Sequence, residues 1–343
     1  MVAYKLISQL SHVELFSPKP EETVAVFKDL LGLQESAREG QSVYLRTWGE
    51  YFHHSIKVTE GPRPGMGHAA YRTDGPQELE DAAKRLEDAG LETRWSDGDV
   101  GHGRAFQFWM PGGHLVELVW EVERVGPGAG GPSVFPNRPQ RQAASGAAAR
   151  RLDHVTVHSA KLMEDVAVLR DALSLRFMEG SRQPDGEVFF ATMTSGAQNH
   201  DYAVLWEKPG DPTYQPGRLN HVSFFFDTRE DELRANDLVC EYGLKLDYGP
   251  VRHGIGEHFS SYFYEPGGNY IELQSGGYWN YIPDWETVYW EVEQGGNSAW
   301  HVYQFGFGLS PAPETAAKPE PGTSFSPSLQ YTARDHENTK TPA

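Results

Sequence analysis

The chain has 343 residues, a formal net charge of −18 and a single cysteine. Its length predicts two domains of roughly 100 to 200 residues each. The strong negative charge argues against a nucleic-acid partner, and no apolar run approaches the roughly 20 residues that a membrane-spanning helix needs.

The lone cysteine, Cys240, excludes internal disulfides and a cluster of thiolate metal ligands. It lies in a stretch with a helical pattern, where we expect it to be buried as a small hydrophobic residue. The start of the chain has neither the sustained apolar core nor the cleavage site of a signal peptide, so we expect a cytoplasmic protein.

Taken in chain order, the predicted elements occur twice. The two halves share one order of sequence patterns, found at residues 10–33, 67–95 and 102–121 and again at residues 152–177, 220–248 and 253–277. Each half contains two copies of a smaller unit: a strand, an amphipathic helix, then two or three strands. The predicted helices span residues 20–32, 76–90, 163–174 and 230–243. This self-similarity predicts four related units paired into two domains.

Composition marks the boundaries of these domains. Residues 125–150 are too rich in Gly, Pro and Ala to form a regular element, and residues 309–343 are rich in Pro, Ser and Thr. We therefore expect an N-terminal domain over residues 1–124, a linker over 125–150, a C-terminal domain over 151–308 and a disordered tail over 309–343.

Three residues of the second half form a candidate metal site. His154 and His221 each stand near the start of a strand that opens a repeat unit, and Glu272 stands in the last strand of the half. The apolar neighbours of Glu272 would face the other side of its strand, which leaves a carboxylate that a cation could satisfy. Two imidazoles and one carboxylate on one face of a metal are typical of non-haem Fe(II) oxygenases, and the same ligands suit Mn(II).

The second half resembles the catalytic half of the type I extradiol ring-cleaving dioxygenases, the catechol 2,3-dioxygenase family of the vicinal oxygen chelate superfamily. The resemblance covers most of residues 1–310 and rests on the three ligand segments and on the motifs "NHDYAVLW", "GPVRHGIGEHFSSYFYEPGGN" and "IELQSGG". It implies an α+β, two-domain vicinal oxygen chelate fold, in which four βαβββ modules pair into two β-barrel-like domains. The first of these domains is expected to be non-catalytic.

The resemblance also implies roles for individual residues. His154, His221 and Glu272 would bind Fe(II), or Mn(II) in its place. His200 would be the acid–base histidine, while His253 and Tyr262 would contact the substrate oxygens. The implied reaction cleaves catechol or an uncharged substituted catechol with O2 to a 2-hydroxymuconate-semialdehyde-type product, in the breakdown of aromatic compounds. A homo-oligomer, often a tetramer in this family, is implied by resemblance alone.

The substrate and the reaction class have alternatives. Family members that take carboxylate-bearing catechols commonly have an arginine five residues before the histidine of "RHG", where this chain has Tyr248. A dihydroxybiphenyl or a carboxylate-bearing catechol stays an alternative substrate. Metal-dependent isomerases or transferases of the glyoxalase type, and metal-free binding proteins of the bleomycin-resistance type, are rival functions on the same fold.

The first half has its own triad at equivalent places, His12, His68 and Glu117. Two differences argue against a second metal there. Glu14 stands where the second half has Thr156 and adds a further negative charge, and Gln107 stands where it has Tyr262. We therefore expect the first triad to be a relic of duplication or a set of buried polar contacts. The nearest acid–base candidates of that half, His53 and His54, are expected to be structural.

Overall fold

The computed structural model describes residues 5–128, 130–142, 145–210, 215–294 and 296–300. Over these residues the chain forms four copies of one βαβββ unit, as the internal repeats predict. The tail predicted over residues 309–343 lies outside the described residues. Within them, no helix is long and apolar enough to cross a membrane.

The first half contains two of the four units. The first comprises β1 (Ile7–Ser17), α1 (Pro20–Asp29), β2 (Gln34–Glu39), β3 (Ser42–Arg46) and β4 (Ile56–Glu60). The second comprises β5 (Gly65–Thr73), α2 (Pro76–Asp88), β6 (Thr93–Ser96), β7 (Ala105–Trp109) and β8 (Leu115–Val119). Both helices begin at a proline, whose fixed φ and missing N–H suit the first turn of a helix.

The second half repeats this order. Its first unit comprises β9 (Arg151–Ser159), α3 (Leu162–Ala167) with a π-helical turn at Val168–Ala172, β10 (Arg176–Arg182), β11 (Val188–Thr194) and β12 (Tyr202–Trp206). Its second comprises β13 (Leu219–Phe226), α4 (Arg229–Glu241), β14 (Leu246–Arg252), β15 (His258–Tyr264) and β16 (Tyr270–Gly276), with a 3₁₀ turn at Ile255–Glu257. A further strand, β17 (Val288–Glu291), precedes a 3₁₀ turn at Val292–Gln294 and pairs in parallel with β10.

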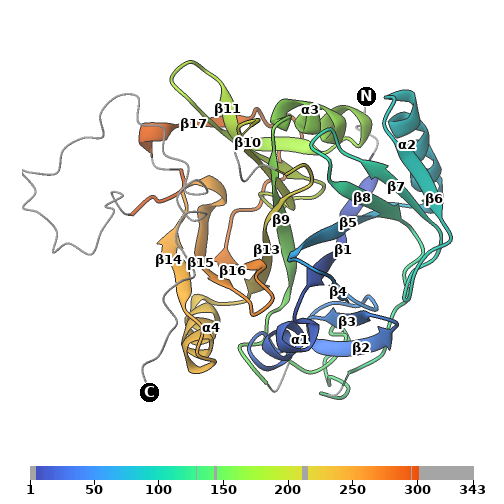
Figure 1. Cartoon of the computed structure of the whole chain (residues 1–343), viewed down its shortest axis with the longest axis vertical. Helices are drawn as coiled ribbons and strands as arrows, with labels where there is room; N and C mark the ends of the chain where they lie inside the picture. The colour runs from blue at the N-terminus through green and yellow to red at the C-terminus, as the bar shows by residue number, and fades with distance from the viewer. Residues whose placement is uncertain (1–4, 129, 143–144, 211–214, 295, 301–343) are drawn as a thin grey trace, which may run out of the picture.

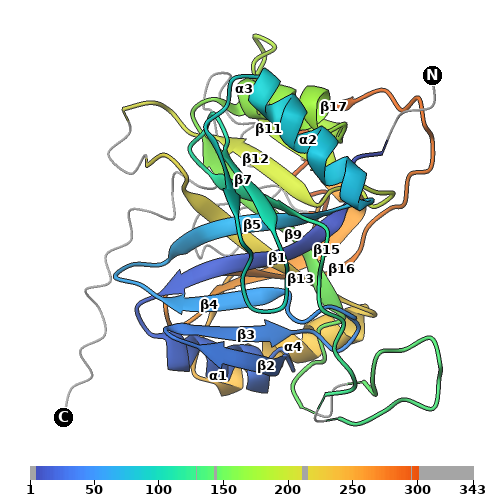
Figure 2. The same cartoon turned by 90° about the vertical axis from the view of Figure 1, so that its right-hand side faces the viewer.

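Each half builds one curved sheet in which the opening strands of its two units are antiparallel neighbours. The strand order is β2-β3-β4-β1-β5-β8-β7-β6 in the first sheet and β14-β15-β16-β13-β9-β12-β11-β10-β17 in the second. Figure 1 shows the two sheets side by side. In Figure 2 the first sheet faces the viewer, with β5, β1, β4 and β3 one below another. Two sheets, each built from two βαβββ units, form the two-domain α+β architecture that the sequence predicts.

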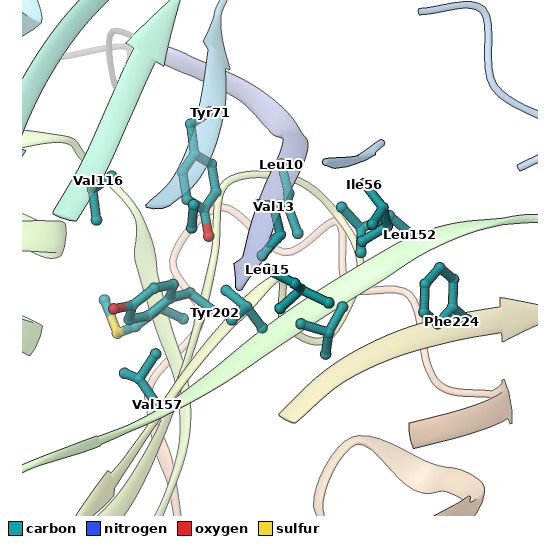
Figure 3. Packing of buried hydrophobic residues seen from close by; sticks show 14 of the residues in the cluster. Leu10, Val13, Leu15, Ile56, Tyr71, Val116, Leu152, Val157, Tyr202 and Phe224 are labelled. Carbon is teal, nitrogen blue, oxygen red and sulfur yellow. The ribbon is translucent and has the colours of Figure 1, made fainter. Parts of the chain in front are cut away.

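The two sheets share one apolar core. Val13 and Leu15 of β1 are fully buried and lie in the same cluster as Val157 of β9, Tyr202 of β12 and Phe224 of β13 (Figure 3). Because neighbouring side chains on a strand face opposite sides, the residues between these apolar ones face the interior of each sheet. Shared packing on one face of each sheet therefore directs polar side chains into the two curved interiors.

Two glycine turns, one from each half, pack against the first strand of the other half. Gly267, in the turn before β16, packs so closely on Ser17 of β1 that a Cβ there would lie 2.2 Å from its hydroxyl. Gly112, in the turn before β8, approaches Ser159 of β9 in the same way, with 2.5 Å to its hydroxyl. Both turns therefore need glycine for close approach, and each joins one half to the opening unit of the other.

A buried carboxylate completes each of these junctions. Glu265, beside the second turn, accepts hydrogen bonds from Thr23 Oγ1 at 2.5 Å and from the backbone N–H of Gly267 at 2.6 Å. At the other junction the carboxylate does not belong to the half that carries the glycine turn. There Asp165 of α3, in the second half, accepts from the N–H of Gly112 in the first half at 2.8 Å. Each buried acid thus finds donors across the junction.

Residues 125–150 and Cys240 can be compared with the sequence expectations. The described residues of 125–150 contain no helix or strand, and most of them are exposed or partly buried. Gln140 among them is fully buried, and its amide donates to the carbonyl of Trp48 at 3.1 Å. Cys240 is exposed on α4, so its predicted burial is wrong. Val239 beside it is buried, and one residue further along a helix lies about 100° around the axis.

Candidate metal centre

Strand register brings the three candidate ligands of the second half together. On adjacent strands β9, β13 and β16, His154 pairs with Ser223 and Ser223 pairs with Glu272. His221 lies two residues before Ser223 on β13 and so faces the same side of the sheet. The small Ser223 leaves room between its neighbours, and the three longer side chains converge in the interior of the second sheet.

The distances between the three side chains match ligands of one octahedral cation. His154 Nε2 lies 3.1 Å from His221 Nε2 and 2.9 Å from Glu272 Oε2, and His221 Nε2 lies 3.3 Å from the same oxygen. For metal–ligand bonds of about 2.1 Å, neighbouring ligands are about 3.0 Å apart in an octahedron and about 3.4 Å apart in a tetrahedron. The observed spacing is closer to the octahedral value.

Hydrogen bonds on the outer nitrogens orient both imidazoles toward this centre. His154 Nδ1–H donates to Asp153 Oδ2 at 3.0 Å, and His221 Nδ1–H donates to Asn220 Oδ1 at 2.6 Å. In the neutral rings each Nε2 therefore presents a lone pair inward. This is the usual arrangement of metal-binding histidines, whose other nitrogen is held by an outer carboxylate or carbonyl.

Charge in the cluster also favours a cation. Glu272 is 1% exposed, and its Oε2 makes no well-aligned hydrogen bond among the described residues. Burial by itself lowers the pKa of His154, but the carboxylates of Glu272 and Asp153 outweigh it and raise that pKa to about 9. The cluster thus holds positive charge firmly, either as a proton or as a divalent ion that replaces it. The residues fit a metal ion.

Tyr262 and His253 form a chain of polar atoms that ends on the same carboxylate. Tyr262 is directly opposite Glu272 on β15, and its hydroxyl donates to Glu272 Oε1 at 2.5 Å. His253 Nε2 lies 2.9 Å from the Tyr262 hydroxyl, and His253 Nδ1–H donates to the carbonyl of Asn297 at 2.5 Å. Neutral His253 therefore faces the hydroxyl with a lone pair, so one phenolic proton serves two acceptors.

His200 lies just before β12 and covers the other side of His154. The two ring centroids are 4.2 Å apart with the planes tilted by 52°. His200 is buried, and its Nδ1 has no hydrogen-bond partner among the described residues. Burial lowers the pKa of His200 well below its usual value, and the nearby His154 and His258 lower it further. The ring is therefore neutral at physiological pH.

Comparison with known proteins identifies the family. The sequence model of the Glyoxalase/Bleomycin resistance protein/Dioxygenase superfamily matches residues 9–118 and 151–273. A metapyrocatechase of Geobacillus stearothermophilus is 36% identical over 297 residues, which cover 86% of this chain and 89% of that protein. The chain belongs to the extradiol dioxygenases of this superfamily.

Two further comparisons agree with this family. A manganese-dependent 2,3-dihydroxybiphenyl 1,2-dioxygenase of Geobacillus genomosp. 3 is 35% identical over 84% of this chain and 91% of that protein. The solved structure of the 2,3-dioxygenase LapB from Pseudomonas sp. KL28 superimposes with a TM-score of 0.78 at 28% identity, over 85% of this extradiol dioxygenase and 100% of that chain. The isomerase, transferase and binding-protein alternatives are thereby set aside.

Two residues that orient the candidate ligands of this extradiol dioxygenase were not predicted from the sequence. Asp153 and Asn220 each directly precede a candidate ligand, in "LDHV" and "LNHV". A residue next to a strand histidine points to the other face, so strand alternation alone does not predict contact between them. The repeated polar residue before histidine is the signal that could have found both.

Proposed function

We propose that the chain is an Fe(II)-dependent dioxygenase that cleaves the ring of catechol, or of an uncharged substituted catechol, beside the diol. His154, His221 and Glu272 would hold the metal on one face. The observation that carries the proposal is the spacing of their inner atoms, 2.9 to 3.3 Å, which suits an octahedral ion with three adjacent positions left for substrate and O2. When bound, the metal would lower the pKa of a catechol hydroxyl and bring the two reactants into contact.

Two imidazoles and one carboxylate with open positions are typical of non-haem Fe(II) oxygenases, which is why we propose iron, although the same ligands also accept Mn(II). One relative of this chain is a manganese-dependent enzyme, so Mn(II) is the alternative to test. Loading the stripped enzyme separately with Fe(II) and Mn(II), and comparing O2 uptake per bound metal, decides between the two.

His253 is suited to accept a proton of the substrate, and Tyr262 is suited to donate a hydrogen bond to the deprotonated oxygen. A catechol hydroxyl that approaches the centre can donate toward His253 Nε2, whose lone pair is fixed by the hydrogen bond from Nδ1 to Asn297. The Tyr262 hydroxyl, 2.9 Å from that nitrogen, can then donate to the substrate oxygen. Together they would hold a singly deprotonated catechol in one orientation.

His200 is suited to general acid–base work on the opposite side of the centre. It is neutral and buried, and its ring lies against His154. A neutral imidazole can both take and give a proton, so His200 can deliver protons to the reacting oxygen atoms and take them back. Its burial excludes bulk water from that exchange.

The surroundings favour an uncharged ring. Tyr248 stands on β14 at the place of the family's carboxylate-binding arginine, with its ring centroid 5.7 Å from that of Tyr262 and 6.4 Å from that of His253. An aromatic side chain there offers a surface for ring stacking and no cation for a carboxylate. Catechol, an alkylcatechol or an arylcatechol such as dihydroxybiphenyl therefore fits better than a catechol with an acidic side chain.

The test measures metal and product together. We expect anaerobically loaded Fe(II) enzyme to consume one O2 per catechol and to form a yellow product that absorbs in the near-visible range. Glu272→Gln should lose metal and activity together. Metal binding without O2 uptake on any uncharged catechol would overturn the proposal.

A matched control is available in Glu232 of α4. This carboxyl group is also buried, and it accepts a hydrogen bond from Ser275 Oγ at 2.7 Å. Burial raises the pKa of Glu232 to about 8, so the group is mostly protonated at pH 7 and a neutral glutamine resembles it. Glu232→Gln should therefore keep metal and activity, which separates the loss of a ligand from the general loss of a buried acid.

A further inference from the structure

The first half reproduces the register of the metal centre. On β1, β5 and β8, His12 pairs with Ala70 and Ala70 pairs with Glu117, as His154, Ser223 and Glu272 pair in the second half. His68 lies two residues before Ala70, where the second half has His221 before Ser223. The interior of the first sheet therefore also gathers two imidazoles and a carboxylate.

A third imidazole joins them. His12 Nε2 lies 3.0 Å from His68 Nε2, and each of these nitrogens lies 3.8 Å from Glu117 Oε1. His102 Nε2 lies 3.5 Å from the same oxygen. The side chains of His12, His102 and Glu117 are at most 3% exposed, and that of His68 is 7% exposed. These four separations lie around the about 3.4 Å between ligands of a tetrahedral ion with bonds of about 2.1 Å. The ligand atoms of His12, His102 and Glu117 all lie within 4.8 Å of one another.

The outer hydrogen bonds leave lone pairs facing the centre. His68 Nδ1–H donates to Glu14 Oε2 at 3.1 Å, and His102 Nδ1–H donates to the carbonyl of Gly103 at 3.0 Å. Because a carboxylate and a carbonyl only accept, the neutral rings present bare Nε2 atoms inward. Glu117 Oε2 accepts from Gln107 at 2.7 Å, but its buried Oε1 has no hydrogen-bond partner among the described residues. An atom that supplies positive charge is needed there.

Neither feature that argued against a metal from the sequence prevents one in the structure. Glu14 lies on the outer nitrogen of His68, where a carboxylate orients a metal-binding histidine. Its charge is offset by Lys57, whose Nζ is 3.2 Å away. Gln107 donates to Glu117 as Tyr262 donates to Glu272.

The exchange of tyrosine for glutamine also changes the coordination. In the second half, the hydroxyl of Tyr262 lies against His253 Nε2, between that ring and the carboxylate. In the first half, Gln107 turns its amide oxygen to Arg94 at 2.7 Å, and His102 Nε2 faces Glu117 directly. The third histidine can therefore act as a fourth ligand and close the site.

We propose that the first half binds a second divalent cation of the zinc type, with His12, His68, His102 and Glu117 as its four ligands. Three imidazoles and one carboxylate without an open position suit a four-coordinate, structural Zn²⁺ ion. The cation would tie β1, β5 and β8 to the loop before β7 that carries His102, and it would stabilise the fold without taking part in ring cleavage.

The test counts zinc in four forms of the full-length protein. Each form is stripped with a chelator, dialysed against Zn²⁺, desalted and assayed by elemental analysis. We expect two zinc ions per chain in the wild type and one in either Glu117→Gln or Glu272→Gln. The double variant should bind none. The proposal is overturned if Glu117→Gln binds as much zinc as the wild type. The positive charge of the cluster would then be a proton on His68.

A second variant covers the case in which Glu117→Gln does not fold. His102→Gln removes one ligand and leaves the pairing of Gln107 with Glu117 in place. This variant is tested in a Glu272→Gln background, where only the first half can bind zinc. Loss of a residue that merely orients a ligand costs at least about tenfold in metal affinity, and loss of a ligand should weaken zinc binding by more than that. Unchanged zinc affinity overturns the proposal. The zinc count of the first half does not depend on ring cleavage, so failure of the proposed reaction leaves this test intact.

Discussion

The orientation of His154 by Asp153 makes a quantitative prediction about metal affinity. Asp153 Oδ2 accepts from His154 Nδ1 at 3.0 Å and also from the side-chain amide of Gln274, while its Oδ1 accepts from Arg151 Nη2 at 2.7 Å. Burial raises the pKa of Asp153, but Arg151 and His154 outweigh it and hold that pKa below its usual value. The carboxylate is therefore ionised and serves three donors at neutral pH.

Asp153→Asn keeps the shape of this residue and removes one acceptor. If the amide oxygen of the new residue faces His154, its NH₂ group opposes the Arg151 guanidinium. If the amide is flipped, the NH₂ group opposes both His154 Nδ1–H and Gln274. Either way the histidine loses the charge that fixes its tautomer, and the expected cost is about tenfold to 100-fold in metal affinity, or about 1.4 to 2.7 kcal/mol.

The assay is a competition titration of Fe(II) or Mn(II) into chelator-stripped protein under anaerobic conditions. Arg151→Gln is the matched control, because it removes the donor on the other oxygen and leaves the contact with His154 intact. We expect this control to weaken metal binding much less than Asp153→Asn. If Asp153→Asn binds both metals as tightly as the wild type, the inner Nε2 of His154 is not the atom that holds the ion.

Three further predictions concern stability, each measured by chemical denaturation. Burial raises the pKa of Asp165 from 3.8 to about 6, so the contribution of this group to stability is present below pH 3.8 and is lost as the pH rises through 6. Asp165→Asn should therefore be up to about 3 kcal/mol more stable than the wild type at pH 8, and equally stable at pH 3. Glu265→Ala leaves the N–H groups of Gly267 and Asn269 unpaired and should lower the free energy of unfolding by about 3 kcal/mol or more. Phe224→Ala should cost about 3 to 5 kcal/mol, because this ring is fully buried in the core shared by the two sheets. A pH-independent difference for Asp165→Asn would contradict the first expectation. A loss under about 1 kcal/mol for Glu265→Ala would contradict the second, and an unchanged stability of Phe224→Ala the third.

Internal repetition made the fold predictable from this sequence. Repeated spacing of helix and strand patterns predicts four units, and it also predicts that residues at equivalent places of paired units meet. His154, His221 and Glu272 are far apart in sequence, but strand pairing around Ser223 brings them within contact. The gathering of these side chains could therefore be foreseen from the repeats, while their role as ligands stays a prediction.

What the sequence did not reveal depends on contacts between units. Asp165 and Glu265 occupy different places in the repeat, yet each supplies the acid of a junction between the halves. No periodicity within one half predicts which residue faces the other half. The packing of Gln140 is similar, because composition marks its segment as a linker whereas burial comes from its contact with the backbone of Trp48. Local patterns determine elements, and contacts between elements decide these details.

One of the positions at which the two interiors of this duplicated fold differ decides where the third histidine lies. Tyr262 lies opposite Glu272, and Gln107 lies opposite Glu117 at the equivalent position. Each donates a hydrogen bond to the carboxylate it faces, so the exchange of tyrosine for glutamine leaves the carboxylate held in the same way. The phenol also places an oxygen against the third histidine, whereas the amide of Gln107 turns its oxygen away to an arginine. Under the two proposals made above, tyrosine keeps the third histidine from the ion and leaves positions for substrate, while glutamine lets it close the site. Tyr262→Gln should therefore shift the second half toward a closed centre that still binds metal, a loss of activity distinct from the loss of metal expected for Glu272→Gln.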